Sequence, residues 1–298
     1  MIDLILGLSL TIIAMILFAF VNILVARSIR HDKLIEGIYV TIIFSTIIIL
    51  VSAIVTGQIF QIFSLPPKVW FLYMLTGIFN FLLARSFNYT GISFLGPSRN
   101  SAIVATRILF ATIFSILLLN ESFNVFVLIG VFLAFIGVVM VSLSQDTKAK
   151  SFSYVGLIFA LSTAFFVGIS VVLIREADLI SNLSVDGVLI AYLTASILYT
   201  PGAIYKQIKS KTLYTRNAFY ILAISGVLSG IAQTSRYSAL EFAPVVVVAS
   251  IVAATPLGTM IFSFFLNKKH EILNKELAIG AVVTVIGVII ISVAVNLL

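Results

Sequence analysis

The sequence contains no cysteine and few charged residues. Of its 298 residues 61% are hydrophobic and 10% are charged, whereas a soluble domain has about 25% charged residues. So few charges cannot cover a water-facing surface, so the composition indicates an integral membrane protein. The absence of cysteine excludes disulfides, thiolate metal sites and cysteine nucleophiles. The net charge of +7 comes largely from basic residues in short segments between apolar runs, which favours membrane orientation over nucleic-acid binding.

Groups suited to catalysis are also scarce. The only histidines, His31 and His270, lie between apolar runs, and the sequence has no H-E-x-x-H motif, no P-loop and no carboxylate pair within a run. An intramembrane protease or a metal-dependent lipid enzyme needs such groups at depth. We therefore predict no enzymatic activity, no metal and no cofactor. The runs also lack an evident titratable acid or histidine, so facilitated diffusion or exchange is as well supported as proton coupling.

Long apolar runs occupy most of the chain. A transmembrane helix needs about 20 mainly apolar residues, and we find ten such runs, at 3–26, 35–57, 69–89, 97–118, 124–144, 153–174, 186–205, 217–238, 243–266 and 275–297. The first run is too long for a signal-peptide core, so we expect it to be retained. The sequence therefore predicts an all-α integral membrane protein with ten transmembrane helices, located in the cell membrane.

The two halves of the sequence end in similar segments. LIGVFLAFIGVVMVS, at 128–142, corresponds to AIGAVVTVIGVIIIS, at 278–292, with two glycines seven residues apart in each. One run earlier, Ala-Thr-Arg at 105–107 corresponds to Ala-Thr-Pro at 254–256. The repeat unit is therefore five runs. Because five is odd, the second copy enters the membrane from the opposite side, which is the inverted-repeat architecture of many secondary transporters.

The segment LLLNESFNVFVLIGVFLAFIGVVMV, at 117–141, resembles the end of an EamA domain of the drug/metabolite transporter superfamily. That pattern has a glutamate after the fourth helix and two spaced glycines in the fifth. The matching residues are Glu121, Gly130 and Gly137 in the first half and Pro256, Glu271, Gly280 and Gly287 in the second. Arg107 stands where the family usually has a proline. The resemblance covers the whole chain as two EamA-like domains, at residues 1–146 and 147–298, and implies a transporter of amino acids, other metabolites, nucleotide sugars or drugs.

Arg107 lies near the middle of the fourth run, where an ionisable group is costly and marks a functional site by default. Its guanidinium suits a substrate carboxylate or phosphate; the alternative is a structural arginine held by helix-end carbonyls or a carboxylate. Asn100, seven residues earlier, would share its helix face. Weaker candidates for the substrate site accompany these two residues: Thr106, Thr255, Gln233, Tyr237 and Asn22.

Arg85 and Arg236 lie near the ends of the third and eighth runs, which are repeat mates. Inversion would place them toward opposite membrane faces, so we consider them, with Tyr89, as candidates for a gate or vestibule. Interfacial snorkelling is the alternative. Pro256 lies within the ninth run, where it predicts a kink that frees backbone carbonyls toward the interior, as a hinge or a static bend.

The basic residues are distributed unevenly between the two membrane sides. Odd-numbered connections and their edges carry Arg27, Arg30, Lys33, Arg85, Arg99, Lys148, Lys150, Lys206, Lys209, Lys211, Arg216, Lys268, Lys269 and Lys275. Even-numbered connections carry Lys68, Arg175 and Arg236. The positive-inside rule then predicts both termini outside, whereas the family resemblance implies both termini in the cytoplasm.

We therefore predict a secondary transporter that moves a small organic metabolite across the cell membrane by alternating access. The arginines favour an anionic or zwitterionic substrate, such as an amino acid. The alternatives are an exporter of drugs or other cationic compounds with the same fold, and a scaffold subunit that transports nothing. The expected partners are the small-molecule substrate and the lipid bilayer, with no nucleic acid, and the chain is expected to be a monomer or a homodimer.

Overall fold

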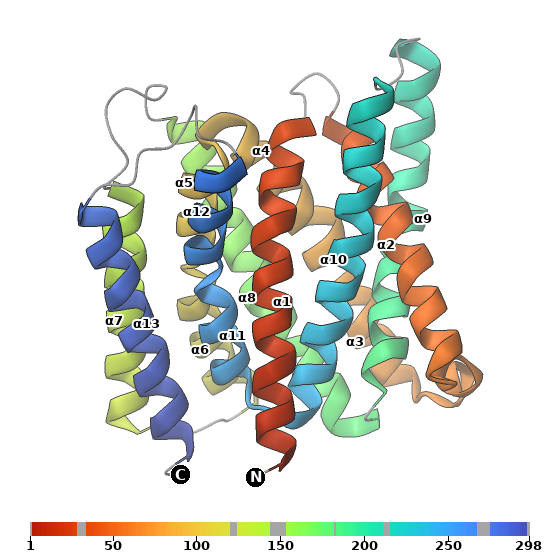
Figure 1. Ribbon diagram of the computed structural model, residues 1–298. Helices are drawn as coiled ribbons and strands as arrows, with labels where there is room; N and C mark the ends of the chain where they lie inside the picture. The colour runs from red at the N-terminus through yellow and green to blue at the C-terminus, as the bar shows by residue number, and fades with distance from the viewer. Residues whose placement is uncertain are drawn as a thin grey trace.

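The computed structural model describes residues 2–28, 34–119, 124–143, 153–181, 183–210, 215–266 and 275–296, which form a bundle of helices without a strand (Figure 1). The first half contains α1 (Ile2–Ser28), α2 (Leu34–Val55), the 3-10 helix η2 (Gln58–Ser64), α3 (Pro67–Thr76), the π-helix η3 (Gly77–Ala84), α4 (Arg85–Leu95), α5 (Pro97–Val104), α6 (Arg107–Leu119) and α7 (Val125–Leu143). The second half contains α8 (Tyr154–Ser181), α9 (Ser184–Ser210), α10 (Arg216–Phe242), α11 (Val245–Ala253), α12 (Thr255–Leu266) and α13 (Lys275–Asn296). Glu121, Glu271 and the predicted boundary at 146/147 lie outside the described residues.

Several of these helices have the length and apolarity of a membrane span. Among the described residues seven segments qualify: Asp3–Ser28, Leu34–Val55, Pro67–Leu95, Tyr154–Ser181, Ser184–Tyr205, Arg216–Phe242 and Val245–Phe262. Shorter apolar helical segments occupy Arg107–Leu119, Val125–Gly137 and Val282–Ile291. The chain is therefore a multi-pass membrane protein.

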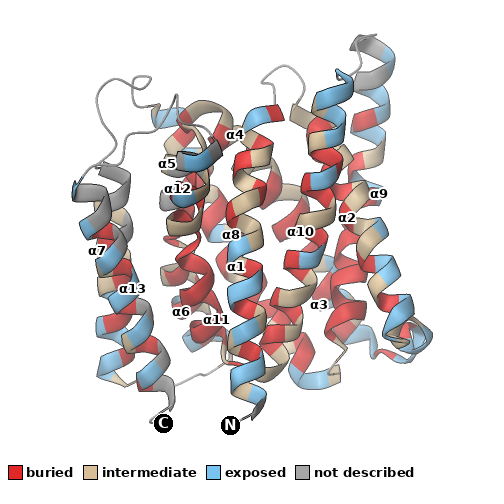
Figure 2. Ribbon diagram, viewed as in Figure 1, coloured by how far each residue is buried: buried red, intermediate tan, exposed pale blue. Residues whose placement is uncertain are grey.

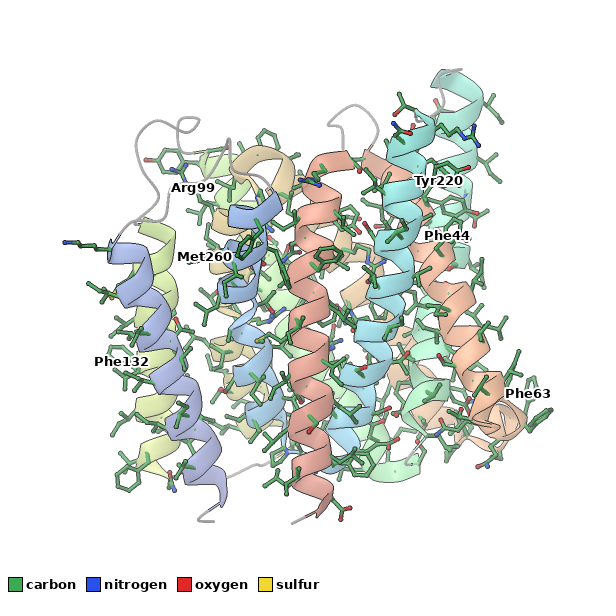
Figure 3. All side chains as sticks on the ribbon, viewed as in Figure 1. Phe44, Phe63, Arg99, Phe132, Tyr220 and Met260 are labelled. Atoms are coloured by element: carbon green, nitrogen blue, oxygen red, sulfur yellow. The ribbon has the colours of Figure 1, made fainter. Side chains whose placement is uncertain are left out.

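The outer surface of the bundle is apolar. Exposed residues lie on the outward faces of the helices (Figure 2), and many are large hydrophobic ones, such as Leu117, Phe132 and Ile197. Phe132 on α7 and Phe63 in η2 point away from the bundle (Figure 3). Soluble monomers rarely expose contiguous apolar patches of this extent, so these faces fit contact with lipid.

The last helices of the two halves, α7 and α13, lie side by side at one edge of the bundle (Figure 1). Their contact is formed by the glycines that match between the halves. A methyl group at Gly137 would meet the carbonyl oxygen of Gly280, and one at Gly287 would meet that of Gly130. Small residues allow helix backbones to approach this closely in a membrane. The first matched glycine of each helix thus faces the second matched glycine of the other, as expected if a two-fold axis relates the repeats.

The fourth and ninth predicted spans are both interrupted. α5 ends at Val104 and α6 begins at Arg107, while α11 ends at Ala253 and α12 begins at Thr255. The turns are closed by tight bonds between residues three apart: the Thr106 N–H donates to the Ile103 carbonyl, and the Ala254 N–H to the Ile251 carbonyl, both at 3.0 Å. The prediction of a continuous helix over 97–118 is therefore wrong. Arg107 is the first residue of a half-helix.

α8 is longer than the apolar run that predicted it. The run was expected to end at 174, whereas the helix continues to Ser181 and brings Asp178 inside, at 1% exposure. The expectation that the spans lack a titratable acid is corrected by this helix. Hydropathy located the end of the apolar run, but the end of the helix depends on how its last two turns pack.

Candidate substrate site

A polar cavity of about 100 Å³ lies inside the bundle, bordered by α1, η3, α4, α5, α6, α8, α10 and α12. Its polar lining residues are Asn22, Asn80, Arg85, Asn88, Tyr89, Ser101, Arg107, Thr163, Ser229, Gln233, Arg236 and Thr255. Both halves of the sequence contribute to this wall. The cavity thus lies between the two repeats, where secondary transporters with inverted repeats bind their substrates.

All formal charge in the cavity wall has one sign. Arg85, Arg107 and Arg236 line it, and no Asp, Glu, Lys or His is among the lining residues. Arg85 and Arg236 are buried and Arg107 is half-buried. Because arginine stays protonated in proteins, the wall carries three positive charges with no carboxylate beside them. A cleft lined by one sign of charge raises the local concentration of oppositely charged solutes.

Arg107 is held by a carbonyl that a proline has released. A helical residue at 256 would donate its N–H to the carbonyl of Val252, four residues earlier, but proline has no N–H. The Val252 oxygen instead accepts from Arg107 Nη2 at 2.5 Å and from Thr255 Oγ1, also at 2.5 Å. The sequence left open whether Arg107 is functional or held by a helix-end carbonyl. In the structure Arg107 donates to the Val252 carbonyl, which uses one of the five N–H groups of the guanidinium.

Arg85 is positioned by the π-helix η3. Its backbone N–H donates to the carbonyl of Asn80, five residues earlier, as in a π-turn, and such turns are frequent at functional sites. Nη2 of Arg85 donates to Tyr192 Oη at 2.6 Å and to Ser229 Oγ at 2.8 Å. The guanidinium carbon also lies 5.2 Å from the Tyr192 ring centroid. Tyr192 and Ser229 belong to the second half, so Arg85 joins the two repeats across the cavity.

Arg236 lies on α10, one turn after Gln233. Its Nε donates to Gln233 Oε1 at 3.0 Å, and its guanidinium carbon lies 5.5 Å from the ring centroid of Tyr237. Arg236 and Arg107 also border a second, smaller cavity of about 10 Å³. That volume suits roughly one water molecule.

Each of the three arginines keeps an N–H group without a partner among the described protein atoms. These groups are Nη1 of Arg85, Nε of Arg107 and Nη2 of Arg236, and Asn80 Nδ2 in the same wall is likewise without one. Buried donors in native proteins are nearly always hydrogen-bonded. Carboxylates and phosphates are groups that supply several acceptors at once.

The structure brings most of the predicted site residues together. Arg107, Thr255, Gln233 and Asn22 line the cavity, and so do the three predicted gate residues Arg85, Arg236 and Tyr89. Arg85 and Arg236, which were expected toward opposite membrane faces as gate or vestibule residues, both border this cavity. The reason is that α4 and α10 continue to Leu95 and Phe242, beyond the predicted ends of their spans, so neither arginine lies at a helix end.

Three predicted residues lie outside the cavity wall. Asn100 donates from Nδ2 to Asn88 Oδ1 at 2.6 Å, and the helix break after it removes the shared face with Arg107. Thr106 donates back to the Ile103 carbonyl at 2.8 Å. Tyr237 is fully buried and stacks on the Tyr73 ring, with centroids 6.4 Å apart. Pro256 is the second residue of α12, directly after the break.

Sequence reasoning did not identify Asn80, Ser101, Thr163 or Ser229 as lining residues. Ser229 lies four residues before Gln233, so the helical period from the predicted Gln233 and Arg236 was the available signal. Asn80 faces the cavity from a π-helix, and neither helical period nor composition predicts a π-turn. Among the described residues no group of three or more His, Cys, Asp or Glu is placed to hold a metal ion.

A multi-pass helix bundle with two similar halves, a symmetric contact between them and a polar cavity at their interface defines the class of membrane transporters with inverted repeats. The family profile described as the EamA-like transporter family matches residues 5–143 and 154–293, one match in each half. The chain belongs to the EamA-like transporter family.

One solved structure, described only as a protein crystal structure, superposes on the chain with a TM-score of 0.73. The match covers 99% of this chain and 98% of that chain at 16% sequence identity. Identity this low supports the fold alone. No curated protein matches the sequence.

Proposed function

We propose that the protein is a secondary transporter that moves a small anionic or zwitterionic metabolite, such as an amino acid, across the cell membrane. The observation that carries this proposal is the single-sign charge of the cavity wall: three arginines and no carboxylate. A substrate carboxylate or phosphate would supply the missing negative charge and accept from the unpaired N–H groups. The transporter has no catalytic role in this proposal.

The broken helices support the same substrate class. α6 and α12 both begin at the cavity wall, with Arg107 and Thr255 as their first residues. The N-terminus of a helix carries partial positive charge and favours anions. One such N-terminus comes from each repeat, as in transporters whose discontinuous helices direct their N-termini at anionic substrate groups. The carbonyl ends of α5 and α11 lie beside them, and the Val252 carbonyl already accepts from Arg107.

The ends of the chain support ten membrane crossings. α1 begins and α13 ends at the same end of the bundle (Figure 1), which requires an even number of crossings. Counting the interrupted pairs α3–α4, α5–α6 and α11–α12 as one crossing each gives ten. We propose that transport occurs by rocking of the two five-crossing repeats about the central cavity, which exposes it alternately to the two sides.

The alternatives make different demands on the cavity. An exporter of cationic drugs needs a carboxylate or a ring of π-faces to hold the positive charge, whereas the lining residues include three arginines and no acid. A scaffold subunit needs no polar cavity. Neither alternative accounts for unpaired donors on Arg85, Arg107 and Arg236.

The proposal is tested by thermal unfolding of the purified protein with a panel of carboxylates, phosphate esters, neutral amino acids and cationic amphiphiles. A ligand at one hundred times its Kd adds about 2.7 kcal/mol to the free energy of unfolding. We expect an anionic or zwitterionic solute to raise the melting temperature of the parent protein and not that of Arg107→Gln. Arg216→Gln is the matched control, because Arg216 is exposed and packs on Tyr220 outside the cavity.

Stabilisation by cationic amphiphiles alone, equal in parent and Arg107→Gln, would overturn the proposed substrate class. Failure of Arg107→Gln to fold would assign Arg107 a structural role. In that case Thr255→Val and Gln233→Leu test the cavity with uncharged substitutions.

The orientation is tested in the same cysteine-free chain. A cysteine replaces Lys209, near the end of α9, or Gln61 in η2, at the opposite end of the bundle (Figure 1). The distribution of basic residues predicts that a membrane-impermeant maleimide labels intact cells at position 61 and not at 209. The reverse pattern would place both termini in the cytoplasm, as the family resemblance implies.

A further inference from the structure

A buried carboxylic acid lies outside the arginine-lined cavity. Asp178, in the last turns of α8, is 1% exposed and forms no ion pair among the described residues. Its Oδ1 accepts from the Tyr73 hydroxyl on α3 at 2.6 Å, while Oδ2 is buried without a partner. Ionisable groups inside a membrane span are costly and are functional by default. Nothing in the arginine site uses this acid.

The charged neighbours of Asp178 form their hydrogen bonds elsewhere. The described titratable groups that act electrostatically on it are Tyr73 on α3, Glu241 on α10 and Arg175 on its own helix, and it acts in turn on Tyr237 of α10. Arg175 donates to the Leu240 carbonyl at 2.5 Å, and Glu241 accepts from the Ser184 N–H at 2.9 Å. The positive neighbour Arg175 and the negative neighbour Glu241 act on Asp178 with opposite sign, and among the described contacts neither is hydrogen-bonded to it.

The protonated form of Asp178 fits this environment better than the ionised form. A carboxylate with one bare oxygen in a buried site carries a desolvation penalty that a single hydrogen bond from a tyrosine hydroxyl does not offset. A proton on Oδ2 removes the charge and leaves Oδ1 free to accept from Tyr73. The conformation in the structure, with this end of α8 packed shut, therefore favours the acid form.

Exposed charged side chains lie close to Asp178 along the helix. Glu176, two residues earlier, pairs with Lys68 at 2.8 Å, and their side chains are 30% and 64% exposed. α8 ends, and α9 begins, at the same end of the bundle as the start of α1 (Figure 1). A small separation of α8 from α3 and α10 at this end would bring water to the carboxyl group.

Asp178 is connected to the substrate cavity by three residues in contact. Its partner Tyr73 stacks on Tyr237 with centroids 6.4 Å apart, and Tyr237 lies beneath the guanidinium of Arg236 at 5.5 Å. Gly187 of α9 lies so close to the Tyr73 ring that even a methyl group there would collide with it. Tyr73 therefore cannot shift without moving its neighbours, so a change at Asp178 reaches Arg236 through packed side chains.

We propose that Asp178 is a proton-binding site that links the opening of this end of the bundle to the release of one proton. When the end is closed, Oδ2 carries the proton. When the end opens, the Oδ2–H bond breaks, the proton passes to water at that face, and the carboxylate remains hydrated. Proton binding stands independently of the proposed substrate; its use as the coupling step of transport rests on the proposed function.

The test uses no substrate and follows opening in the purified protein through a single introduced cysteine. Val185, in the first turn of α9, is 5% exposed, and its N–H donates to Gln58 of η2. Val185→Cys reacts with a maleimide only when this end opens. Gln61→Cys, exposed in η2 at the same end, corrects for the rise of thiol reactivity with pH.

In the parent background, the ratio of the labelling rates at positions 185 and 61 is expected to rise with pH. If opening releases one proton, this ratio rises by up to about tenfold per pH unit. Asp178→Asn, which resembles the protonated acid, is expected to give a low ratio at every pH. Glu176→Gln, two residues away on the surface, is expected to retain the parental slope.

Two results would overturn the proposal. One is a ratio in the parent background that does not change with pH, which decides the matter whether or not Asp178→Asn folds. The other is a parental slope in Asp178→Asn. If that variant does not fold, Tyr73→Phe replaces it: loss of the hydroxyl must shift the pH at which labelling accelerates, and an unchanged profile rejects Asp178 as the group. None of these outcomes touches the ligand panel that tests the arginine cavity.

Discussion

The helix breaks in the two repeats have similar backbone turns and different residues. In the second half the break precedes Pro256, which cannot donate to the Val252 carbonyl. In the first half Arg107 stands at the corresponding position, yet the helix is interrupted there as well. The break in the second half supplies a hydrogen-bond acceptor, the Val252 carbonyl. The break in the first half supplies the donor, because Arg107 Nη2 donates to Val252 O at 2.5 Å. Departure from internal symmetry, at a single residue, therefore creates the contact that joins the two breaks at the cavity.

The threonines next to the breaks show the symmetry that remains. Thr106 donates to the carbonyl three residues earlier at 2.8 Å, and Thr255 does the same at 2.5 Å. Only Thr255 lines the cavity. The two repeats therefore share the threonine hydrogen bond to the carbonyl three residues earlier. They differ in that the Val252 carbonyl also accepts from the Arg107 guanidinium, whereas the Ile103 carbonyl does not.

A proline at position 107, which makes the helix break of the first half resemble that of the second, should have the largest effect on ligand binding. Arg107→Pro places a proline at the first position of α6, where a missing N–H is tolerated, and Thr255 still donates to the Val252 carbonyl. We expect the protein to fold and to lose the stabilisation by an anionic ligand, about 2.7 kcal/mol at one hundred times the parental Kd. Thermal unfolding with and without the solute checks both statements. Retained stabilisation would show that the arginine is not needed for binding.

The symmetric contact between α7 and α13 is tested by adding a methyl group. Gly137→Ala places a Cβ against the backbone of Gly280 and Thr284, which cannot move aside as a side chain can. We expect a loss of about 1–3 kcal/mol of stability, typical of overpacking. Gly202→Ala on α9 meets nothing within 4 Å and is expected to stabilise the helix by about 0.5–1 kcal/mol. Equal unfolding midpoints for the two variants would contradict the glycine-mediated contact.

Restoring the N–H at the second break is expected to have an intermediate effect. In Pro256→Ala the new N–H competes with Arg107 for the Val252 carbonyl, so the guanidinium loses its anchor. A hydrogen bond to a charged group contributes about 1.5–3 kcal/mol, and part of this should appear as an affinity roughly tenfold lower. The concentration dependence of ligand-induced stabilisation measures it. An unchanged affinity would indicate that substrate alone orients Arg107.

Replacing either of the two threonines next to the helix breaks is expected to have the smallest effect on stability, and the pair allows a direct comparison of the two breaks. Thr255→Val and Thr106→Val each remove one hydroxyl bonded within its own turn, so both should lose a similar stability of about 0.5–1.5 kcal/mol. Only Thr255→Val should also weaken ligand binding, by less than about tenfold. A matching loss of affinity in Thr106→Val would place that residue in the site as well.

Sequence reasoning predicted an all-helical membrane protein with two repeats, because both properties depend on local pattern. Apolar runs of bilayer length and glycines seven residues apart are visible without any tertiary contact. The arginines were recognised as site candidates for the same reason, since a charge in an apolar run stands out. Their meeting in one cavity was not predicted, because the ends of α4 and α10 extend beyond the runs and the side chains point inward.

Asp178 is a buried residue that hydropathy did not identify. It lies four residues beyond the predicted end of its span, so the sequence assigned it to a connection between spans. Packing against α3 and α10 keeps those residues helical and removes them from water. The π-helix that positions Arg85 and Asn80 is likewise a product of packing, since no local propensity favours a turn closed over five residues.

The sequence by itself determined that this chain spans a membrane in helices, that its halves repeat, and that cationic groups lie among its spans. These properties follow from composition and period, which act along the chain. Tertiary structure alone decided which carbonyl receives Arg107, that three arginines share one cavity without an acid, and that Asp178 is buried beside Tyr73. Each of these involves residues from both halves of the sequence, and only packing of the two repeats brings them together.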